Sequence, residues 1–329
     1  MSPAARPSFF RGSLSKDTLD AGSLLAILQH RAASTPTKLV LSCTLDDDDD
    51  DDRPPRLHDV TFAGLDASAR RVAGLLQSQK KGPFQVGDIV LLWFAHESTH
   101  DLVAAFYGCL YAGAIAVVVN PDAPDLARLV SQTRARLVLS NSHLSRQRAL
   151  AKVKSAFQGF TFKASTSSSS SLTSQSDDKT TAKHLGWYHT DAKTTAHANL
   201  DHVAGVEAHT TTVVACLQYT AGTSAPAKPV VWTHANLLAA ARHVAWIHSY
   251  ETTVQFLPPH TPAGLFHSVV APVFTGARVI HLASFRPRRW LRLVATYGAV
   301  HTAGPASAYA RAAASTSRDA AAALDVSAL

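Results

Sequence analysis

The sequence has no long apolar run and only three cysteines. Its longest apolar runs, at 115–119 and 213–217, are far shorter than the ~20 residues that cross a bilayer. The N-terminal stretch at 1–16 also lacks the apolar segment of a secretory signal. The cysteines form no Cys-x-x-Cys pair, so we expect reduced, buried thiols in a cytoplasmic protein without a transmembrane segment: Cys43, Cys109 and Cys216.

Clustered metal ligands and clustered basic residues are also missing. A group of histidines at 184–209 gives neither an i, i+4 helical pair nor a Cys-x-x-Cys partner, so we predict no metal site there. The net charge is +7, yet the lysines and arginines are scattered. The densest basic stretch, at 286–292, is typical of a solvated helix face. Since the stacking aromatics are absent as well, a nucleic-acid-binding function is disfavoured.

What is present suits a globular α/β protein. The 329 residues are 46% hydrophobic, which is enough for one large or two smaller domains. We expect a disordered N-terminus at 1–19, a first α/β subdomain at 20–160 and a second at 187–329. The Asp/Pro-rich stretch at 46–56 predicts a solvated loop between two strands, and the Ser/Thr-rich stretch at 161–186 a flexible insertion.

Helical and strand patterns alternate along both subdomains. In the first, helices are expected at 20–33, 61–77, 101–113 and 125–136, and strands at 89–94, 114–119 and 137–140. Ser98 or Thr99 can cap the third helix and Gly113 can end it. In the second, strands are expected at 213–219, 229–234, 253–259, 278–282 and 299–304, with helices at 236–248, 264–274, 287–298 and from 305 onward. This order predicts parallel sheets with right-handed crossovers.

One loop stands out for its chemistry. LQYTAGTSAPAKPVVWTH, at 217–234, places small hydroxylated residues and one lysine directly after a buried strand. Backbone N–H groups at the carboxyl edge of a sheet can face an anion, the hydroxyls can donate to phosphate oxygens, and Lys228 can neutralise charge. The GxxxxGK[ST] pattern is not met, because Gly222 lies six residues before Lys228 and Pro229 follows it.

With its continuation ANLL, this segment resembles the phosphate-loop motif of the adenylate-forming superfamily, whose usual form ends in Thr-His-x-Asn-Leu. The leading Leu-Gln-Tyr-Thr is similar to the fatty acyl-AMP ligase branch, especially the disco-interacting protein 2 group and its fungal relatives. GDIVLLWFAHESTHDLVAAFYGCLYAGAIAVVVNP and FLPPHTPAGLFHSVVAPVFTGARVIHL resemble other parts of that branch. The resemblance covers residues 20–329 except the two low-complexity segments.

The resemblance implies an α/β fold with two stacked, layered sheets, the N-terminal part of an adenylate-forming domain. It implies ATP and Mg²⁺ as cofactors and a fatty acid or other carboxylate as substrate. The residues expected at the ATP phosphates are Thr220, Gly222, Thr223, Ser224 and Lys228. A substrate pocket is expected around His260, Gly264, Gly304 and Pro305. A capped apolar helix is the equal alternative for His260 and Gly264, and a purely structural role is equally open for Gly304 and Pro305. His234 is interpreted as a helix-start residue, and no catalytic residue is assigned.

The departures from the family pattern limit this expectation. Ala225 and Pro229 stand where the family has glycines, and Thr261 and Pro262 replace a His-Asp pair. Alanine and proline reduce backbone freedom in the loop, and proline removes an N–H. The sequence ends before the family's adenine loop and catalytic lysine, so we expect a truncated, incomplete or weakly active ligase-like domain, completed by a C-terminal part or a partner chain. The alternative is a non-catalytic scaffold or binding module that keeps the fold.

Overall fold

The computed structural model describes residues 22–45, 55–78, 84–122, 126–141, 162–164, 185–190, 213–220, 227–247 and 251–315. The chain divides into two compact units that are interleaved along the sequence. Unit 1 comprises Met1–Asp66, Glu207–Val213 and Thr233–Leu329, and unit 2 comprises Ala67–Val206 and Val214–Trp232. The sequence favoured consecutive subdomains instead. The predicted boundaries at 19, 160 and 186 stay predictions, because most of the residues around them lie outside the described ranges.

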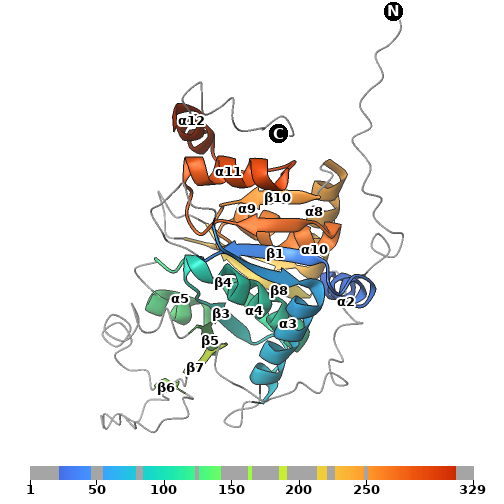
Figure 1. Cartoon of the computed structure of the whole chain (residues 1–329). Helices are drawn as coiled ribbons and strands as arrows, with labels where there is room; N and C mark the ends of the chain where they lie inside the picture. Colours follow the sequence, from blue (N-terminus) through green and yellow to red (C-terminus); the bar gives the residue numbers. More distant parts are fainter. Residues whose placement is uncertain are drawn as a thin grey trace, which may run out of the picture. The chain divides into compact units, whose positions relative to one another are not determined.

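Unit 2 is built on a seven-stranded sheet with the order β6-β7-β5-β3-β4-β8-β9 (Figure 1). Strands β3, β4, β5, β6, β7 and β8 are linked by parallel pairs. The parallel sheet expected from the sequence is therefore confirmed. The elements that lie mainly in this unit are β3 (Ile89–Leu92), β4 (Ile115–Val118), β5 (Leu137–Ser140), β6 (Phe162–Ala164), β7 (Leu185–His189), β8 (Val214–Tyr219), β9 (Pro229–Thr233), α3 (Phe62–Gln77), the 3-10 turn η1 (His96–Ser98), α4 (Thr99–Ala112) and α5 (Leu126–Thr133).

Strands β3, β4 and β5 are buried on both faces, as their continuous apolar runs predict. On one face Leu91, Val117 and Val138 pack with Val130 of α5. Helix α4 packs against β3 and β4, and α3 comes close to α4 because Gly108 has no side chain. A Cβ atom at 108 would lie 2.6 Å from the Cβ of Val72.

The ends of α4 were only partly predicted. Gly113 adopts the left-handed conformation, with φ of 72°, and its N–H bonds the last carbonyls of the helix, as expected. Ser98 occupies the N-cap position but makes no capping bond; its hydroxyl accepts from the Asn141 amide instead. The hydroxyl of Thr99 donates to the carbonyl of His96. The prediction that the side chain of Ser98 or Thr99 caps α4 was therefore wrong, because both hydroxyls bond other partners.

Unit 1 contains a four-stranded sheet with the order β10-β11-β1-β2. The β10–β11 and β11–β1 pairs are parallel, whereas β1 and β2 are antiparallel, so this sheet is mixed. The Asp/Pro-rich segment joins β1 to β2, in line with a loop between strands, although residues 46–54 lie outside the described ranges. The strands are β1 (Leu39–Thr44), β2 (Leu57–Thr61), β10 (Thr252–Gln255) and β11 (Arg278–His281).

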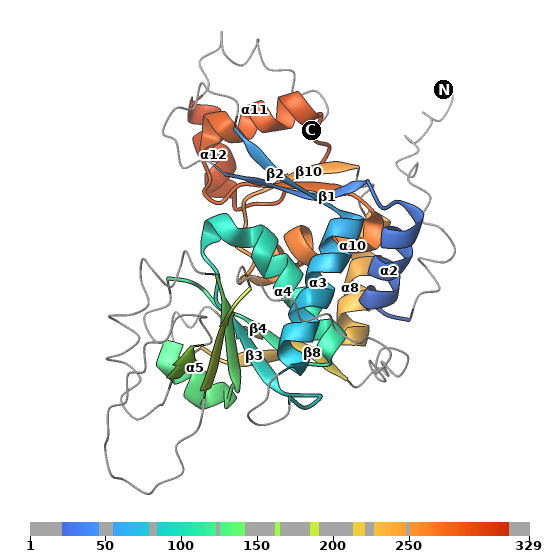
Figure 2. The ribbon, with the colours of Figure 1, turned by 60° about the horizontal axis from the view of Figure 1, so that its bottom comes forward.

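Helices cover both faces of the unit 1 sheet. Helices α11 and α12 pack on Val254 and Ile280 from one side, and α2, α8 and α10 lie side by side on the other (Figure 2). The predicted strand at 299–304 is reduced to a single bridge between Thr253 and His301. The helices are α2 (Leu24–Ser34), α8 (His234–Ile247), α9 (Pro262–Leu265), the π-helical turn η4 (Phe266–Val270), α10 (Ala271–Thr275), α11 (Pro287–Tyr297) and α12 (Ala306–Ser315).

The helix predicted at 264–274 begins earlier and contains the π turn η4. Pro272 has no N–H, so the carbonyl of Ser268 lacks its usual donor four residues on, and a wider turn forms there. Gly276, with φ of 78° in the left-handed region, ends the helix. Arg31 of α2 supports this end, because its guanidinium donates to the carbonyls of Val273 and Phe274 at 2.7 and 2.6 Å. Partial burial lowers the pKa of Arg31 to about 10, so it remains charged at neutral pH.

The three cysteines are free and buried, as the sequence predicted. Burial raises the pKa of the Cys216 thiol to about 12 and raises that of Cys109 further. Within the described ranges, none of the helices has the length and apolar character needed to cross a membrane.

Candidate functional site

The structure brings Thr220 and Lys228 together at the neck of the predicted phosphate loop. The backbone N–H of Thr220 donates to the carbonyl of Lys228 at 3.0 Å, and the N–H of Lys228 donates to the Thr220 hydroxyl at 3.0 Å. Both residues are exposed. These bonds place the backbones of Thr220 and Lys228 at the mouth of the loop, and the Thr220 hydroxyl keeps its own proton to donate. Gly222, Thr223 and Ser224 lie outside the described residues, so their predicted roles stay predictions.

The loop connects two strands that run in opposite directions. Thr220 is bonded to Lys228 at one end of the pair, and the N–H of His234 donates to the carbonyl of Val213 at the other. Pro229 is the first residue of β9, where its missing N–H removes no bond from the interior of the sheet. The loop therefore closes an antiparallel pair at the edge of an otherwise parallel sheet.

Strand β8 carries a buried amide that the sequence did not single out. Gln218 is 1% exposed, and within the described residues neither its amide nitrogen nor its amide oxygen has a hydrogen-bond partner. Residues two apart share a face of a strand, so this side chain lies on the same face as Thr220. In the sequence, the spacing of Gln218 and Thr220 by two residues did not by itself indicate that the two side chains belong to one site.

The Thr-His-x-Asn part of the motif forms a capping box. The N–H of Asn236 donates to the Thr233 hydroxyl at 3.1 Å, and the N–H of Thr233 donates to the side-chain oxygen of Asn236 at 3.3 Å. This reciprocal pair satisfies two backbone donors at the start of α8. His234 is the first residue of α8 and is 3% exposed, which confirms it as a helix-start residue.

The predicted pocket residues lie in unit 1, where two of them converge on the turn after β10. A Cβ atom on Gly264 would lie 2.0 Å from the carbonyl oxygen of Pro258, and one on Gly304 would lie 2.2 Å from the ring of Phe256. Both positions thus require glycine for close packing. Half-buried His260 belongs to the same turn, and exposed Pro305 accepts from the N–H of Ala308 at the start of α12.

Thr261 and Pro262, which stand where the family pattern has a His-Asp pair, have a local structural role. Thr261 is the N-cap of α9: its hydroxyl accepts from the N–H of Gly264 at 3.1 Å and donates to the carbonyl of Pro258 at 2.8 Å. Pro262 occupies the first helical position, where a missing N–H costs nothing. The capped helix that the sequence offered as the alternative interpretation is therefore present. A role of His260 and Gly264 in a pocket stays a prediction.

A set of polar side chains, of which Gln255 is buried and His267 and His301 are half-buried, lies beside this turn. The side-chain oxygen of Gln255 accepts from the N–H of Ala303 at 3.3 Å, and its amide nitrogen lies 3.5 Å from Nδ1 of His301. The His301 ring stacks on that of His267 in η4, with centroids 5.3 Å apart. Gln255 ends β10, His267 belongs to η4 and His301 follows α11. Because these three segments are separate in the sequence, only the fold brings the side chains together.

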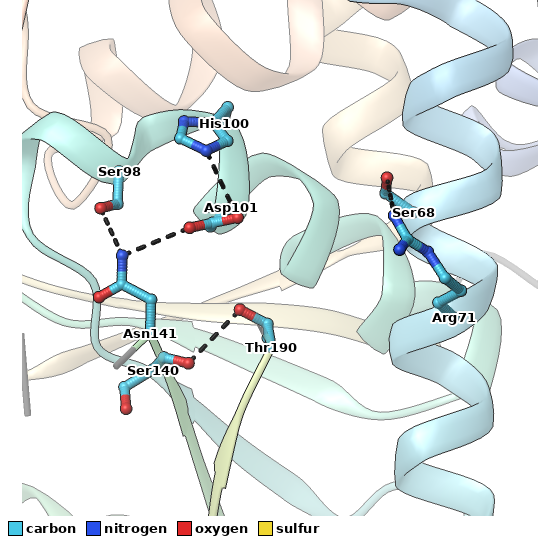
Figure 3. Close-up of polar contacts among 8 residues, drawn as sticks. All are labelled: Ser68, Arg71, Ser98, His100, Asp101, Ser140, Asn141 and Thr190. Carbon is cyan, nitrogen blue, oxygen red and sulfur yellow. Dashed lines mark hydrogen bonds and ion pairs between the residues drawn. The ribbon is translucent and has the colours of Figure 1, made fainter. Parts of the chain in front are cut away.

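A second polar group was missed at the carboxyl ends of β3 and β5 (Figure 3). The amide of Asn141 lies between the hydroxyl of Ser98 and a carboxylate oxygen of Asp101, to which it donates at 2.5 and 3.3 Å. His100 lies 3.5 Å from the other oxygen of Asp101. Ser98 and Asn141 are buried, so this network ties the end of β5 to the start of α4. No described His, Cys, Asp or Glu side chains form a group of three or more that could hold a metal ion.

Comparison with known proteins identifies the family. The model of the family described as AMP-binding enzyme matches residues 28–329. The chain therefore belongs to the AMP-binding enzyme family, and its α/β fold with two sheets is the fold of adenylate-forming enzymes. In a solved fatty acid AMP ligase from Legionella pneumophila, a similar fold covers 96% of this chain and 50% of that chain, with a TM-score of 0.69 and 24% identity.

Two curated relatives indicate the branch. A medium-chain-fatty-acid–[acyl-carrier-protein] ligase, JamA, from Moorena producens (strain JHB) is 28% identical over 263 residues, which is 77% of this chain and 40% of that protein. Human disco-interacting protein 2 homolog B is 33% identical over 131 residues, or 37% of this chain and 8% of that protein. The chain thus spans less than half the length of these relatives, and the resemblance to the fatty acyl-AMP ligase branch is confirmed.

Proposed function

We propose that this chain binds ATP through the 220–228 loop and takes part in forming an acyl adenylate from a fatty carboxylate. The observation that carries the proposal is the neck, where Thr220 and Lys228 stand side by side at the carboxyl end of β8. A hydroxyl donor and an ammonium group at this edge match the oxygens and charge of a polyphosphate. Family membership and the fatty-acid ligases among the relatives support the same chemistry.

In the reaction, a carboxylate oxygen would attack the α-phosphorus of ATP, and the bond to the β-phosphate oxygen would break to release pyrophosphate. Thr220 would orient the phosphates, and Lys228 would offset charge on them as the bond breaks. Mg²⁺ commonly binds through substrate phosphates and one or two carboxylates, and when bound it would neutralise the same oxygens. We assign no catalytic base or acid, and we place the protein in the cytoplasm on the basis of its three free thiols.

A non-catalytic binding module is the second candidate. It is favoured by Thr261 and Pro262, which begin a short helix at the position of the family's His-Asp pair. A module of this kind could hold ATP or an adenylate without turning it over.

The test is a thermal shift of the full chain with ATP–Mg²⁺ and with a non-hydrolysable acyl-adenylate analogue. Binding to the folded state at one hundred times Kd adds about 2.7 kcal/mol of stability, so a shift of several degrees is expected. Lys228→Ala should abolish the shift with ATP–Mg²⁺, whereas Lys38→Ala, at an exposed lysine in unit 1, should keep it. An unchanged melting temperature at millimolar ATP–Mg²⁺ would contradict the proposal. Pyrophosphate exchange then separates an enzyme from a binding module.

A further inference from the structure

One face of the unit 1 sheet is polar where β10 and β11 end. Val254 and Ile280 pack with α11 and α12 on the opposite face. Because successive side chains of a strand alternate between faces, Thr253, Gln255 and His281 lie on the polar face. These three side chains are buried, and Gln255 and His281 are register partners. A buried sheet face is normally apolar, so its polar residues need a reason.

The segment after α11 adds a histidine to the same face. His301 forms a parallel bridge with Thr253, so the two side chains point to one side of the sheet. The His301 ring stacks on His267 of η4, and Ser268 follows His267 in that turn. We call this group the polar cluster, and its members are Thr253, Gln255, His267, Ser268, His281 and His301.

Hydrogen bonds fix where the amide of Gln255 donates. Its oxygen accepts from the N–H of Ala303 at 3.3 Å, so its nitrogen is the atom 3.5 Å from Nδ1 of His301. An amide nitrogen can only donate, so Nδ1 accepts and the proton of the neutral ring is on Nε2. His301 therefore carries an N–H donor on the side of its ring away from Gln255.

Two hydroxyl groups of the cluster have no partner. Within the described residues, Oγ1 of Thr253 and Oγ of Ser268 are buried and make no hydrogen bond. The exposed fractions of the two residues are 1% and 2%. Buried hydroxyls normally have a partner, because an unmade hydrogen bond leaves the cost of removing the group from water uncompensated. The two hydroxyls therefore indicate that the cluster accommodates a polar ligand.

The charges around the cluster favour an anionic ligand. Between Glu251 and Asp319, the stretch that contains the whole cluster, the sequence has no aspartate or glutamate. Asp59 of β2 forms an ion pair at 3.2 Å with Arg278, which lies two residues before Ile280 and so on the opposite face. The cluster itself supplies O–H and N–H donors, and a carboxylate accepts from several donors at once.

We propose that the polar cluster binds a second carboxylate of the acid substrate, which makes that substrate a dicarboxylic fatty acid. This proposal rests on the proposed function, because the other carboxylate is the one that would be adenylated. A methyl-ended chain would leave the hydroxyls of Thr253 and Ser268 unpaired, whereas a carboxylate can accept from both hydroxyls and from an imidazole N–H.

The first experiment is calorimetric titration of the full chain with decanedioate and with decanoate, in the absence of ATP. The two acids have the same chain length and differ in the second carboxylate. We expect decanedioate to bind about tenfold more tightly, which corresponds to about 1.4 kcal/mol and matches one hydrogen bond to a charged group. Equal affinities for the two acids would overturn the proposal.

Thr253→Val separates a binding role from a structural one. Valine has nearly the same shape without the hydroxyl, so this change removes an unpaired buried group and should raise the melting temperature of the ligand-free chain. The same variant should bind decanedioate several-fold more weakly and decanoate as the wild type does. A variant that keeps the wild-type preference for decanedioate would contradict the proposal.

His301→Phe tests the imidazole, and His243→Phe, at an exposed histidine of α8, is the matched control. Phenylalanine keeps a ring beside His267 but cannot donate a hydrogen bond. We expect His301→Phe to lose most of the preference for decanedioate and the control to retain it. Circular dichroism confirms that each variant is folded, and equal preferences in the two variants would count against the cluster.

Pyrophosphate exchange with each acid distinguishes this proposal from the proposed function. Faster exchange with decanedioate would support both proposals. Equal exchange with the two acids would support adenylate formation and overturn the role of the cluster. If decanedioate binds more tightly but neither acid supports exchange, the second-carboxylate site stands and adenylate formation fails.

Discussion

At the scale of single residues, close packing explains two glycines that the sequence associated with a substrate pocket. Gly264 and Gly304 have no room for a Cβ atom, because a backbone carbonyl and the Phe256 ring occupy that space. The sequence could identify both positions through the family motif. Gly264 and Gly304 are 40 residues apart, so the sequence could not show that both pack against the turn after β10.

We predict that Gly264→Ala destabilises the protein by about 1–3 kcal/mol, the usual cost of overpacking. The neighbour is the backbone carbonyl of Pro258, which cannot move aside as a flexible side chain would. Urea unfolding measures the loss. Gly22→Ala is the control, because nothing lies within 4 Å of its added atom, and its effect should stay within about 0.5 kcal/mol. Equal unfolding midpoints for the two variants would contradict the packing argument.

At the scale of elements, the Thr-His-x-Asn motif has a local cause in helix capping, which makes it readable from the sequence. We predict that Thr233→Ala lowers the free energy of unfolding by about 1 kcal/mol, because the N–H of Asn236 loses its acceptor. Thr233→Ser keeps the hydroxyl and should restore most of the stability in the same urea titration. If serine and alanine destabilise equally, the capping bond is not the cause.

The contact between α2 and α10 is an element-level feature that no sequence pattern revealed. Arg31 donates to two carbonyls of residues more than 240 positions away and lies 5.8 Å from the Phe62 ring centroid. We predict that Arg31→Met costs about 2 kcal/mol of stability, since hydrogen bonds from a charged donor are lost. Arg31→Lys should recover only part of this loss, because an ammonium cannot reproduce the forked geometry. Arg71→Met, at an exposed arginine of α3, is the urea-unfolding control and should be near neutral.

Most elements were predictable from periodicity, and the errors have physical reasons. Buried strands such as β3 and β4 appear as unbroken apolar runs, and glycines such as Gly113 mark helix ends. The π turn η4 was missed, because only the missing N–H of Pro272 signals it and the spacing of apolar residues stays helical. The strand at 299–304 was overestimated, since a short run that begins Ala299-Val300 does not show that a neighbouring strand is available.

At the scale of the whole molecule, the two compact units could not be read as consecutive segments. Strand β1, near the start of the chain, pairs with β11 more than 230 residues later. Long-range pairing of this kind leaves no local pattern, so the sequence favoured two consecutive subdomains. The candidate loop and the predicted pocket belong to different units, and the motif order, rather than composition, was what indicated a shared function.

The central claim is that the loop closed by Thr220 and Lys228 holds the phosphates of ATP. Its most direct test is acetylation footprinting of lysines on the full chain, quantified by mass spectrometry with and without ATP–Mg²⁺. We predict that Lys228 becomes several-fold slower to acetylate when ATP–Mg²⁺ is present, because its ammonium contacts phosphate, while the exposed Lys38 reacts at an unchanged rate. Equal acetylation of Lys228 with and without millimolar ATP–Mg²⁺ would contradict the account.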